Sequence, residues 1–271
     1  MVRINPLEQS RGTRPRAFVT GASSGIGAAF ARLLARNGYE LTIVARRGDR
    51  LESLAEGIQR RYMRAVEILP IDLTHEAGLE AAERRLAQYP SLELLVNNAG
   101  KASIGYFSEI DPRRHDSDIR LNVIALTRLT RAALPGMVKQ GHGAIINVSS
   151  LGAFTPGPWE ATYFATKAYV SSLTEALHEE LRGTGVQVQA LCPGFTHTEF
   201  TEVAGIDASE VSDRMWQEPE EVVEASLAAL KAGKLICIPG RINRTSATTM
   251  RLLPRRLVRR MIGLQTRRLI P

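Results

Sequence analysis

Short runs rich in β-branched residues alternate with longer amphipathic stretches over residues 16–240 of this 271-residue chain. Runs of strand length lie at residues 16–20, 40–45, 65–71, 93–97, 143–149, 186–192 and 234–239. Apolar residues at helical spacing lie between them, near residues 26–37, 51–58, 76–88, 116–138, 160–182 and 219–232. This order is typical of repeated βαβ units. The sequence therefore predicts a single-domain α/β fold, a doubly wound parallel sheet with helices on both faces.

The positive charge of the chain is confined to its end. The formal net charge is +7, but nine arginines and no acidic residue lie in residues 241–271, so the preceding part is slightly acidic. We therefore expect no nucleic-acid partner. Cys192 and Cys237 lie in separate apolar runs, which indicates reduced thiols and no metal site. The chain has no apolar run of membrane-spanning length and no apolar signal region near Met1, so we expect a cytoplasmic protein.

A glycine-rich loop, TGASSGIG at residues 20–27, joins the first predicted strand to the first predicted helix. Glycines allow the backbone to turn tightly and to approach a pyrophosphate, and the amide groups at the helix start can face the anion. Ser23 and Ser24 can add hydroxyl donors. Taken alone, the loop could equally be a structural turn. Its position favours a Rossmann-type dinucleotide site.

The second predicted strand ends in Arg46 and Arg47, at the place where an NAD site usually carries an acid. The nearest acid is Asp49. Guanidinium groups at this edge suit the 2′-phosphate of NADP(H), because they supply positive charge and forked donors. The alternative is a pair of solvated loop arginines. With the glycine-rich loop before them, we favour NADP(H) as the cofactor.

Tyr163 and Lys167 lie four residues apart in a predicted helix, which places both side chains on one face. A nearby ammonium group can lower the pKa of a tyrosine, which is otherwise about 10. Ser150 ends a strand thirteen residues earlier and could hold a substrate carbonyl oxygen, with Ser149 as a competitor. Asn122 lies within a helical stretch. The Tyr163–Lys167 pair alone could be an ordinary helix face.

Together these motifs resemble the classical short-chain dehydrogenase/reductase family, over about residues 16–240. The matching segments are TGASSGIG (20–27), Asp72-Leu73, NNAG (97–100), Asn122, Ser150, YFATK (163–167) and PGFTHT (193–198). The resemblance implies that Tyr163 is the proton donor or acceptor and that Lys167 lowers its pKa and holds the nicotinamide ribose. It also implies that Ser150 orients the substrate oxygen and that Asn122 supports a water-linked proton relay.

The same resemblance implies a cofactor site built from several loops. Gly21, Ser23, Ser24, Gly25, Ile26 and Gly27 would hold the pyrophosphate. Asp72 and Leu73 would border the adenine, and Asn98, Ala99 and Gly100 would lie near its ribose. Thr196 and Thr198 would fix the nicotinamide, next to Pro193 and Gly194 at the strand end. His197 receives no catalytic role.

The sequence thus predicts an NADP(H)-dependent oxidoreductase that interconverts a carbonyl and a secondary alcohol, with reduction favoured. A non-catalytic NADP(H)-binding sensor and a tail-driven membrane-surface protein are the rivals. Aromatic residues in the loops expected around the substrate suggest an apolar ketone or acyl substrate, or else simply pack the loops or an oligomer interface. They are Phe107, Phe154, Trp159, Phe195, Phe200 and Trp216.

Three segments are expected along the chain. They are a basic lead-in at residues 1–15, a Rossmann domain at 16–240 with its substrate loop at about 193–216, and a basic amphipathic extension at 241–271. Pro254 can open a helix in this extension. The apolar side of that helix carries Leu257, Val258, Met261, Ile262 and Leu264, surrounded by Arg255, Arg256, Arg259, Arg260, Arg267 and Arg268. Such a helix could lie on an anionic membrane or dock on the core or on a partner subunit. A homo-oligomer is also expected.

Overall fold

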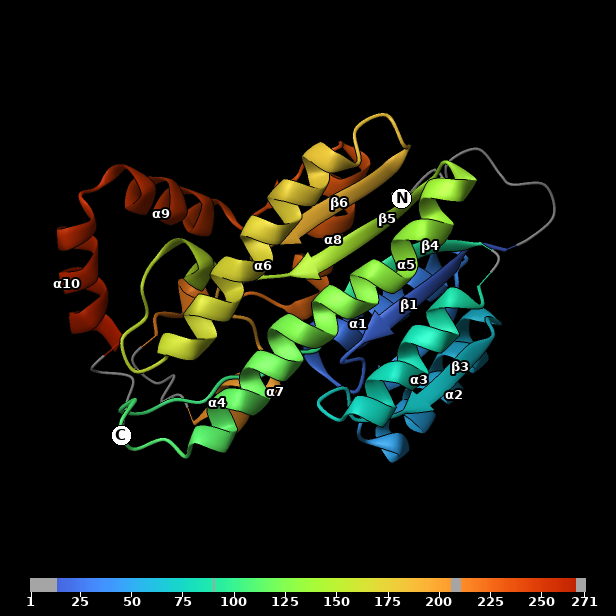
Figure 1. Cartoon of the computed structure of the whole chain (residues 1–271), viewed down its shortest axis with the longest axis horizontal. Helices are drawn as coiled ribbons and strands as arrows, with labels where there is room; N and C mark the ends of the chain where they lie inside the picture. The colour runs from blue at the N-terminus through green and yellow to red at the C-terminus, as the bar shows by residue number, and fades with distance from the viewer. Residues whose placement is uncertain (1–13, 90, 206–210, 267–271) are drawn as a thin grey trace.

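The computed structural model describes residues 14–89, 91–205 and 211–266, and these residues form one parallel sheet between two layers of helices (Figure 1). The strands are β1 (Arg16–Thr20), β2 (Glu40–Ala45), β3 (Val66–Pro70), β4 (Leu92–Asn97), β5 (Gly143–Val148), β6 (Val186–Leu191) and β7 (Ile236–Cys237). Their order in the sheet is β3-β2-β1-β4-β5-β6-β7, and every neighbouring pair is parallel. The predicted doubly wound α/β fold is confirmed.

The helices alternate with the strands along the chain. The α-helices are α1 (Gly25–Arg36), α2 (Gly48–Tyr62), α3 (Glu76–Ala87), α4 (Pro112–Ile119), α5 (Leu126–Gln140), α6 (Ala161–Glu180), α7 (Glu199–Ala204), α8 (Pro219–Lys231), α9 (Arg241–Leu252) and α10 (Arg255–Thr266). A π-helix, η1 (Arg120–Ala125), joins α4 to α5, and short 3-10 turns lie at η2 (Leu151–Phe154) and η4 (Asp213–Met215).

Each face of the sheet has its own core. Successive side chains of a strand point to opposite faces. In β1, Val19 packs with residues of α1, α2 and α8, whereas its neighbour Phe18 packs with residues of α3 and α5. Both side chains are fully buried. Burial on both faces explains why the strands read as continuous apolar runs.

The strand order reverses direction between β1 and β4, and this reversal positions the site. From β1 the chain builds the sheet outward through β2 and β3, then returns to the other side of β1 with β4. The loops that follow β1 and β4 therefore diverge at the carboxyl end of the sheet. A crevice at this point is where open α/β sheets bind their ligands.

Three segments differ from the expected pattern. The helical stretch predicted near residues 116–138 is α4, η1 and α5 in direct succession, with the π-turn in the middle. The last strand is limited to Ile236–Cys237. The C-terminal extension contains two helices, α9 and α10, which project beside the domain in Figure 1. Residues 1–13 of the expected lead-in, residues 206–210 of the expected substrate loop, and Arg267 and Arg268 lie outside the described residues.

Candidate active site

A cavity of about 790 Å³ lies at the carboxyl ends of the central strands. It is lined by most of the site residues that the sequence predicted: Gly21, Ser23, Ser24, Gly25, Ile26, Arg46, Arg47, Asp72, Leu73, Asn98, Ala99, Gly100, Ser150, Tyr163, Lys167, Pro193, Gly194, Thr196 and Thr198. Gly27 and Asn122 are absent from this lining and lie behind it. The volume is in the usual range for small-molecule and cofactor sites.

The glycine-rich loop makes a tight turn between β1 and α1. Gly21 and Gly25 have positive φ values of 65° and 52°, which favour glycine. A Cβ atom on Gly27 would lie 2.2 Å from the carbonyl oxygen of Gly21, so the helix start packs directly on the turn. The first turn of α1 has no acidic residue. The loop and the start of α1 line the cavity, and this arrangement fits the pyrophosphate of a dinucleotide, because the first amide groups of a helix and the helix dipole favour an anion.

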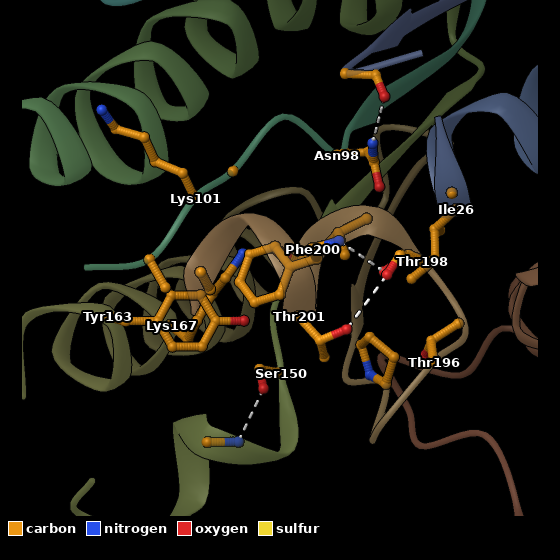
Figure 2. A pocket seen from close by; sticks show the side chains of 18 of the residues that line it. Ile26, Asn98, Lys101, Ser150, Tyr163, Lys167, Thr196, Thr198, Phe200 and Thr201 are labelled. Atoms are coloured by element: carbon orange, nitrogen blue, oxygen red, sulfur yellow. Dashed lines mark hydrogen bonds between the residues drawn. The ribbon is translucent and has the colours of Figure 1, made fainter. Parts of the chain in front are cut away.

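Asn98 fastens the end of β4 to the glycine-rich loop (Figure 2). Its Nδ2 atom donates to the carbonyl oxygens of Thr20 at 3.0 Å and Gly21 at 3.1 Å. In return, the Thr20 hydroxyl accepts from the backbone amides of Asn98 and Ala99, both at 3.0 Å. These bonds fix the two loops on either side of the crevice relative to each other.

Charged groups lie at the end of the cavity that the loops after β2 and β3 form. Asp72 accepts hydrogen bonds from the Thr74 amide at 2.8 Å and the Thr74 hydroxyl at 2.7 Å. Burial raises the pKa of Asp72, but these bonds outweigh it and, with Arg46 nearby, hold the pKa below its usual value. Arg46 is exposed at the end of β2, and Arg47 lies over the glycine-rich loop. The two arginines fit the charge of a 2′-phosphate.

Helix α6 brings Tyr163 and Lys167 to the cavity on one face, as their spacing predicts (Figure 2). Lys167 is only 5% exposed, and its Nζ atom donates to the carbonyl oxygen of Val148 at 2.8 Å. The same Nζ atom lies 5.6 Å from the centre of the Tyr163 ring. The ammonium group is therefore held at a fixed position beneath the phenol.

The two serines after β5 have separate environments. Ser149 is buried, and its hydroxyl donates to the Lys167 carbonyl oxygen at 2.9 Å and pairs with Ser171 at 2.8 Å. Ser150 lines the cavity, accepts from the Gly152 amide at 3.0 Å and hydrogen-bonds the Tyr163 hydroxyl. Both serines belong to the cavity lining, but the Ser149 hydroxyl is engaged in its two bonds, so Ser150 is the better placed to meet a ligand beside Tyr163.

Asn122 lies in the π-helix behind the site. Its Nδ2 atom donates to the Lys101 carbonyl oxygen at 2.8 Å and to the Thr166 hydroxyl at 3.1 Å, and its Oδ1 atom accepts from the Lys101 amide at 3.0 Å. The residue is buried and fully paired. It joins the helical segment, the loop after β4 and helix α6, close behind Lys167. Single π-turns of this kind are frequent at functional sites.

Burial opposes ionisation of both reactive side chains in the ligand-free molecule. Burial raises the pKa of Tyr163 well above its usual value, the hydrogen bond with Ser150 lowers it in part, and the charge of Glu160 raises it further. Burial lowers the pKa of Lys167 to about 8. In the ligand-free molecule the hydrogen bond with Ser150 lowers the pKa of Tyr163, and the lowering that the resemblance assigns to Lys167 stays a prediction.

The loop aromatics divide into two groups. Phe154, Phe195 and Phe200 line the cavity, with the Phe200 ring 5.5 Å from that of Tyr163. The remaining three lie outside the lining and pack against other rings. Phe107 packs on His115, Trp159 on Tyr106, and Trp216 on Phe195 and His197. Three of the six aromatics are thus placed where a ligand could contact them, and a role for them in substrate binding stays a prediction.

The C-terminal helices form a wall of the cavity that the sequence did not assign. Ser246, Ala247 and Met250 of α9 and Ile262 of α10 belong to the lining. Arg251 also lies over the Phe154 ring, with its guanidinium carbon 4.3 Å from the ring centre. The extension therefore contacts the core, which is one of the three arrangements that the sequence left open.

Glu160 is a second lining residue that sequence reasoning missed. It precedes α6 by one residue and lies three residues before Tyr163. Burial raises its pKa to about 7. The sequence could have indicated this, because a residue three positions before the tyrosine of YFATK is expected on the same side of the helix.

Within the described ranges, no three His, Cys, Asp or Glu side chains gather as metal ligands. None of the helices in these ranges is long and apolar enough to cross a membrane.

Comparison with known proteins defines the class. The family model for short chain dehydrogenases matches residues 15–208. The chain therefore belongs to the short-chain dehydrogenase family and is an oxidoreductase.

Particular relatives and solved structures agree with this. A very-long-chain 3-oxoacyl-CoA reductase-like protein of Arabidopsis thaliana is 34% identical over 262 residues, which cover 93% of this chain and 82% of the relative. A short-chain dehydrogenase from Sphingobium yanoikuyae in complex with NADPH has a TM-score of 0.81 at 40% identity, covering 87% and 92% of the two chains. A bulky-bulky ketone specific alcohol dehydrogenase from Comamonas testosteroni has a TM-score of 0.76 at 31% identity, covering 89% and 95%.

Proposed function

We propose that this protein is an NADP(H)-dependent oxidoreductase that reduces an apolar ketone or acyl substrate to the secondary alcohol. The observation that carries the proposal is the convergence of Ser150, Tyr163 and Lys167 on a cavity whose other end has the glycine-rich loop and two arginines. The complete set argues against a non-catalytic sensor. The NADPH complex of the Sphingobium relative supports the choice of cofactor.

In the proposed reaction the nicotinamide supplies the hydride. The Ser150 and Tyr163 hydroxyls hold the carbonyl oxygen, and Tyr163 gives its proton to that oxygen as negative charge develops. The protonated Lys167 stabilises the phenolate that remains, because its ammonium group is fixed beside the ring. Asn122 positions the helix and loop around Lys167 so that a water-linked path can return the proton.

The walls of the cavity support an apolar substrate. Phe154, Phe195 and Phe200 come from the loops, and Met250 and Ile262 come from the C-terminal helices. Burial of such side chains against a ligand favours lipophilic groups. The names of two relatives also support an apolar substrate. The Comamonas protein is named as specific for bulky-bulky ketones, and the Arabidopsis protein as very-long-chain 3-oxoacyl-CoA reductase-like.

The proposal is tested with a panel of ketones and oxoacyl thioesters, measuring NADPH consumption in the purified full chain. We expect turnover of bulky apolar ketones and little turnover with NADH. Arg46→Asp adds repulsion towards the 2′-phosphate and should weaken NADPH binding without weakening NADH binding. Equal binding of both nucleotides by the unaltered protein would refute the NADP(H) assignment. Binding without turnover of any carbonyl would favour the sensor.

We also propose peripheral contact between α10 and anionic membranes. The described part of α10 exposes Leu257, Met261 and Leu264, which are 46%, 39% and 71% exposed, beside arginines and no acidic residue. Apolar and basic side chains on one surface helix complement an anionic bilayer. Co-sedimentation with anionic and neutral vesicles tests this. Charge-reversal of Arg256 and Arg260 should abolish a salt-sensitive preference for anionic lipid, and absence of any such preference would contradict the proposal.

A homo-oligomer is proposed on separate grounds. Ile124, Val138 and Tyr169 are exposed apolar side chains on η1, α5 and α6, and the Tyr169 hydroxyl lies 3.1 Å from that of Thr127. Exposed apolar groups on adjacent helices are typical of subunit contacts. Light scattering on the eluting protein measures the mass, and a strict monomer at micromolar concentration would contradict this proposal.

A further inference from the structure

Arg47 and Glu199, which both line the cavity, form an ion pair. The Nη1 atom of Arg47, the residue before α2, lies 2.8 Å from Oε2 of Glu199, the first residue of α7. The other carboxylate oxygen of Glu199 bonds to Arg50. One acidic side chain therefore joins the start of α7 to two arginines of the segment that follows β2.

The same guanidinium is also bonded to the glycine-rich loop. Its Nη2 atom donates to the hydroxyls of Ser23 at 2.9 Å and Ser24 at 3.0 Å. The start of α7 is close to this loop as well, since a Cβ atom on Gly25 would lie 2.7 Å from Cγ2 of Thr198. Arg47 thus connects the glycine-rich loop, α2 and α7 in the ligand-free molecule.

Glu199 uses the donors that a 2′-phosphate would use. A carboxylate and a phosphate monoester are both anions that bind the forked guanidinium group. The hydrogen bonds from Arg47 and Arg50 hold the pKa of Glu199 below its usual value, so it is ionised at neutral pH. A phosphate placed beside these arginines would meet a like charge. The pair is nevertheless exchangeable, because both side chains are about 40% exposed, and exposed ion pairs are weak.

We propose that Glu199 is an internal competitor for the 2′-phosphate of NADP(H), and that its displacement releases α7. This inference rests on the proposed use of NADP(H). When the 2′-phosphate binds, Arg47 and Arg50 both exchange the carboxylate for the phosphate, and the link between α2 and α7 is lost. Phe200, Val203 and Ala204 of α7 line the cavity. The phosphate that distinguishes NADP(H) from NAD(H) therefore acts on the wall of the substrate end.

The coupling is reciprocal. If phosphate binding breaks the bonds between Glu199 and the arginines, a variant without this carboxylate has no such bonds to lose. Its affinity for the phosphate is then higher by the free energy of those bonds. NADH lacks the phosphate and does not compete with Glu199. The sign of the effect is thus specific: loss of this acid improves binding of one nucleotide and not of the other.

The first test compares Glu199→Gln with the unaltered full chain by isothermal titration. The probes are NADPH, NADH and adenosine 2′,5′-bisphosphate, which has the phosphate but no nicotinamide. Two exposed ion pairs predict about fivefold tighter binding of NADPH and of the bisphosphate, with NADH unchanged. Glu202→Gln is the matched control, because it removes the same charge from an exposed position of the same helix. It should leave all three affinities unchanged.

The second test follows α7 itself by hydrogen exchange of the amides in residues 200–204. Adenosine 2′,5′-bisphosphate should increase their exchange in the unaltered protein, whereas adenosine 5′-diphosphate should not. Glu199→Gln should show the increased exchange without ligand.

Three outcomes would overturn the inference. They are equal effects of the Glu199 and Glu202 variants, equal gains for NADH and NADPH, and no ligand-dependent exchange in α7. If the unaltered protein prefers NADPH and one of these outcomes is seen, only this inference fails. If the unaltered protein shows no preference for NADPH, the proposed cofactor fails first, and this inference with it.

Discussion

The backbone of Gly194 and the side-chain amide of Asn243 lie in direct contact. A Cβ atom on Gly194 would fall 2.6 Å from Nδ2 of Asn243. Asn243 belongs to α9 and is 3% exposed, and its Nδ2 atom donates to Oε1 of Gln217 at 2.9 Å and to the Pro239 carbonyl oxygen at 3.0 Å. One buried amide of the C-terminal segment thus packs on the loop that follows β6. This close contact leaves no room for a side chain at position 194.

Gly194→Ala should destabilise the protein and loosen α9. The added methyl group must displace a buried, hydrogen-bonded amide, and overpacking of this kind costs about 1–3 kcal/mol. The measurement is the free energy of unfolding in urea. The control is Gly136→Ala in α5, where a Cβ atom would meet nothing within 4 Å and alanine should slightly stabilise the helix. Equal stability of the two variants would show that α9 does not depend on this contact.

Tyr163→Phe should abolish most turnover while NADPH still binds. The ring and its contact with Phe200 remain, but the transferable proton is lost, and loss of a general acid lowers kcat about 10²–10⁴-fold. Steady-state kinetics with any accepted ketone gives kcat, and fluorescence titration gives the NADPH affinity. A variant with most of its turnover would rule out Tyr163 as the proton donor.

Ser150→Ala and Ser149→Ala should differ in their effect on catalysis. Loss of the Ser150 hydroxyl removes one donor to the substrate oxygen and should lower kcat about 100-fold, and loss of its bond from the Gly152 amide should cost about 1 kcal/mol of stability. Loss of the Ser149 hydroxyl removes its bonds to Lys167 and Ser171 and should cost about 1 kcal/mol of stability. Kinetics and urea unfolding on both variants give the comparison. A larger loss of kcat in Ser149→Ala would reverse the assignment.

Glu160→Gln should make stability less dependent on pH. Burial raises the folded-state pKa of Glu160 to about 7, above its ordinary value of 4.5. Between these values the unfolded chain releases the proton and the folded chain keeps it, so the stability contribution of Glu160 falls as pH rises through this window. In thermal unfolding from pH 4.5 to 8, the Tm of the variant should rise relative to the Tm of the unaltered protein as the pH increases. Glu175→Gln, at an exposed site on α6, should show no such trend. Parallel curves for Glu160→Gln and the unaltered protein would contradict the prediction.

Met250→Ala should weaken the binding of bulky ketones without affecting the cofactor. Met250 lines the cavity from α9, and loss of apolar contact there should raise KM about tenfold for a substrate that reaches this wall. NADPH affinity should be unchanged. Leu252→Ala, an 82% exposed position on the same helix, serves as the control. A rise in KM for small and bulky ketones alike would place the substrate elsewhere.

Local patterns in the sequence were enough to predict the fold and most of the residues that were found to line the cavity. Strand and helix periods are properties of neighbouring residues, and the glycine-rich loop and the Tyr163–Lys167 pair depend on spacings of a few residues. Ser149 and Ser150 remained ambiguous because both adjoin the cavity, and only the bonds of the Ser149 hydroxyl to Lys167 and Ser171, which are tertiary contacts, distinguish them.

The other features depend on contacts between distant segments. The bond between Arg47 and Glu199 joins residues 152 positions apart, and Ile262 reaches the cavity through the docking of α9. The π-turn around Asn122 has no compositional signal, since the residues on both sides are helical. These arrangements follow from tertiary packing, and no short stretch of the sequence predicts them.

The residues that line the cavity come from two different parts of the chain. Residues 15–208, the part shared with the whole family, supply the glycine-rich loop and the reactive side chains, whereas Met250 and Ile262 come from beyond that part. We therefore predict that changes in these two helices alter which carbonyl compounds the protein accepts, while hydride transfer and proton donation are retained. For protein engineering, libraries of variants confined to α9 and α10 should yield new substrate ranges.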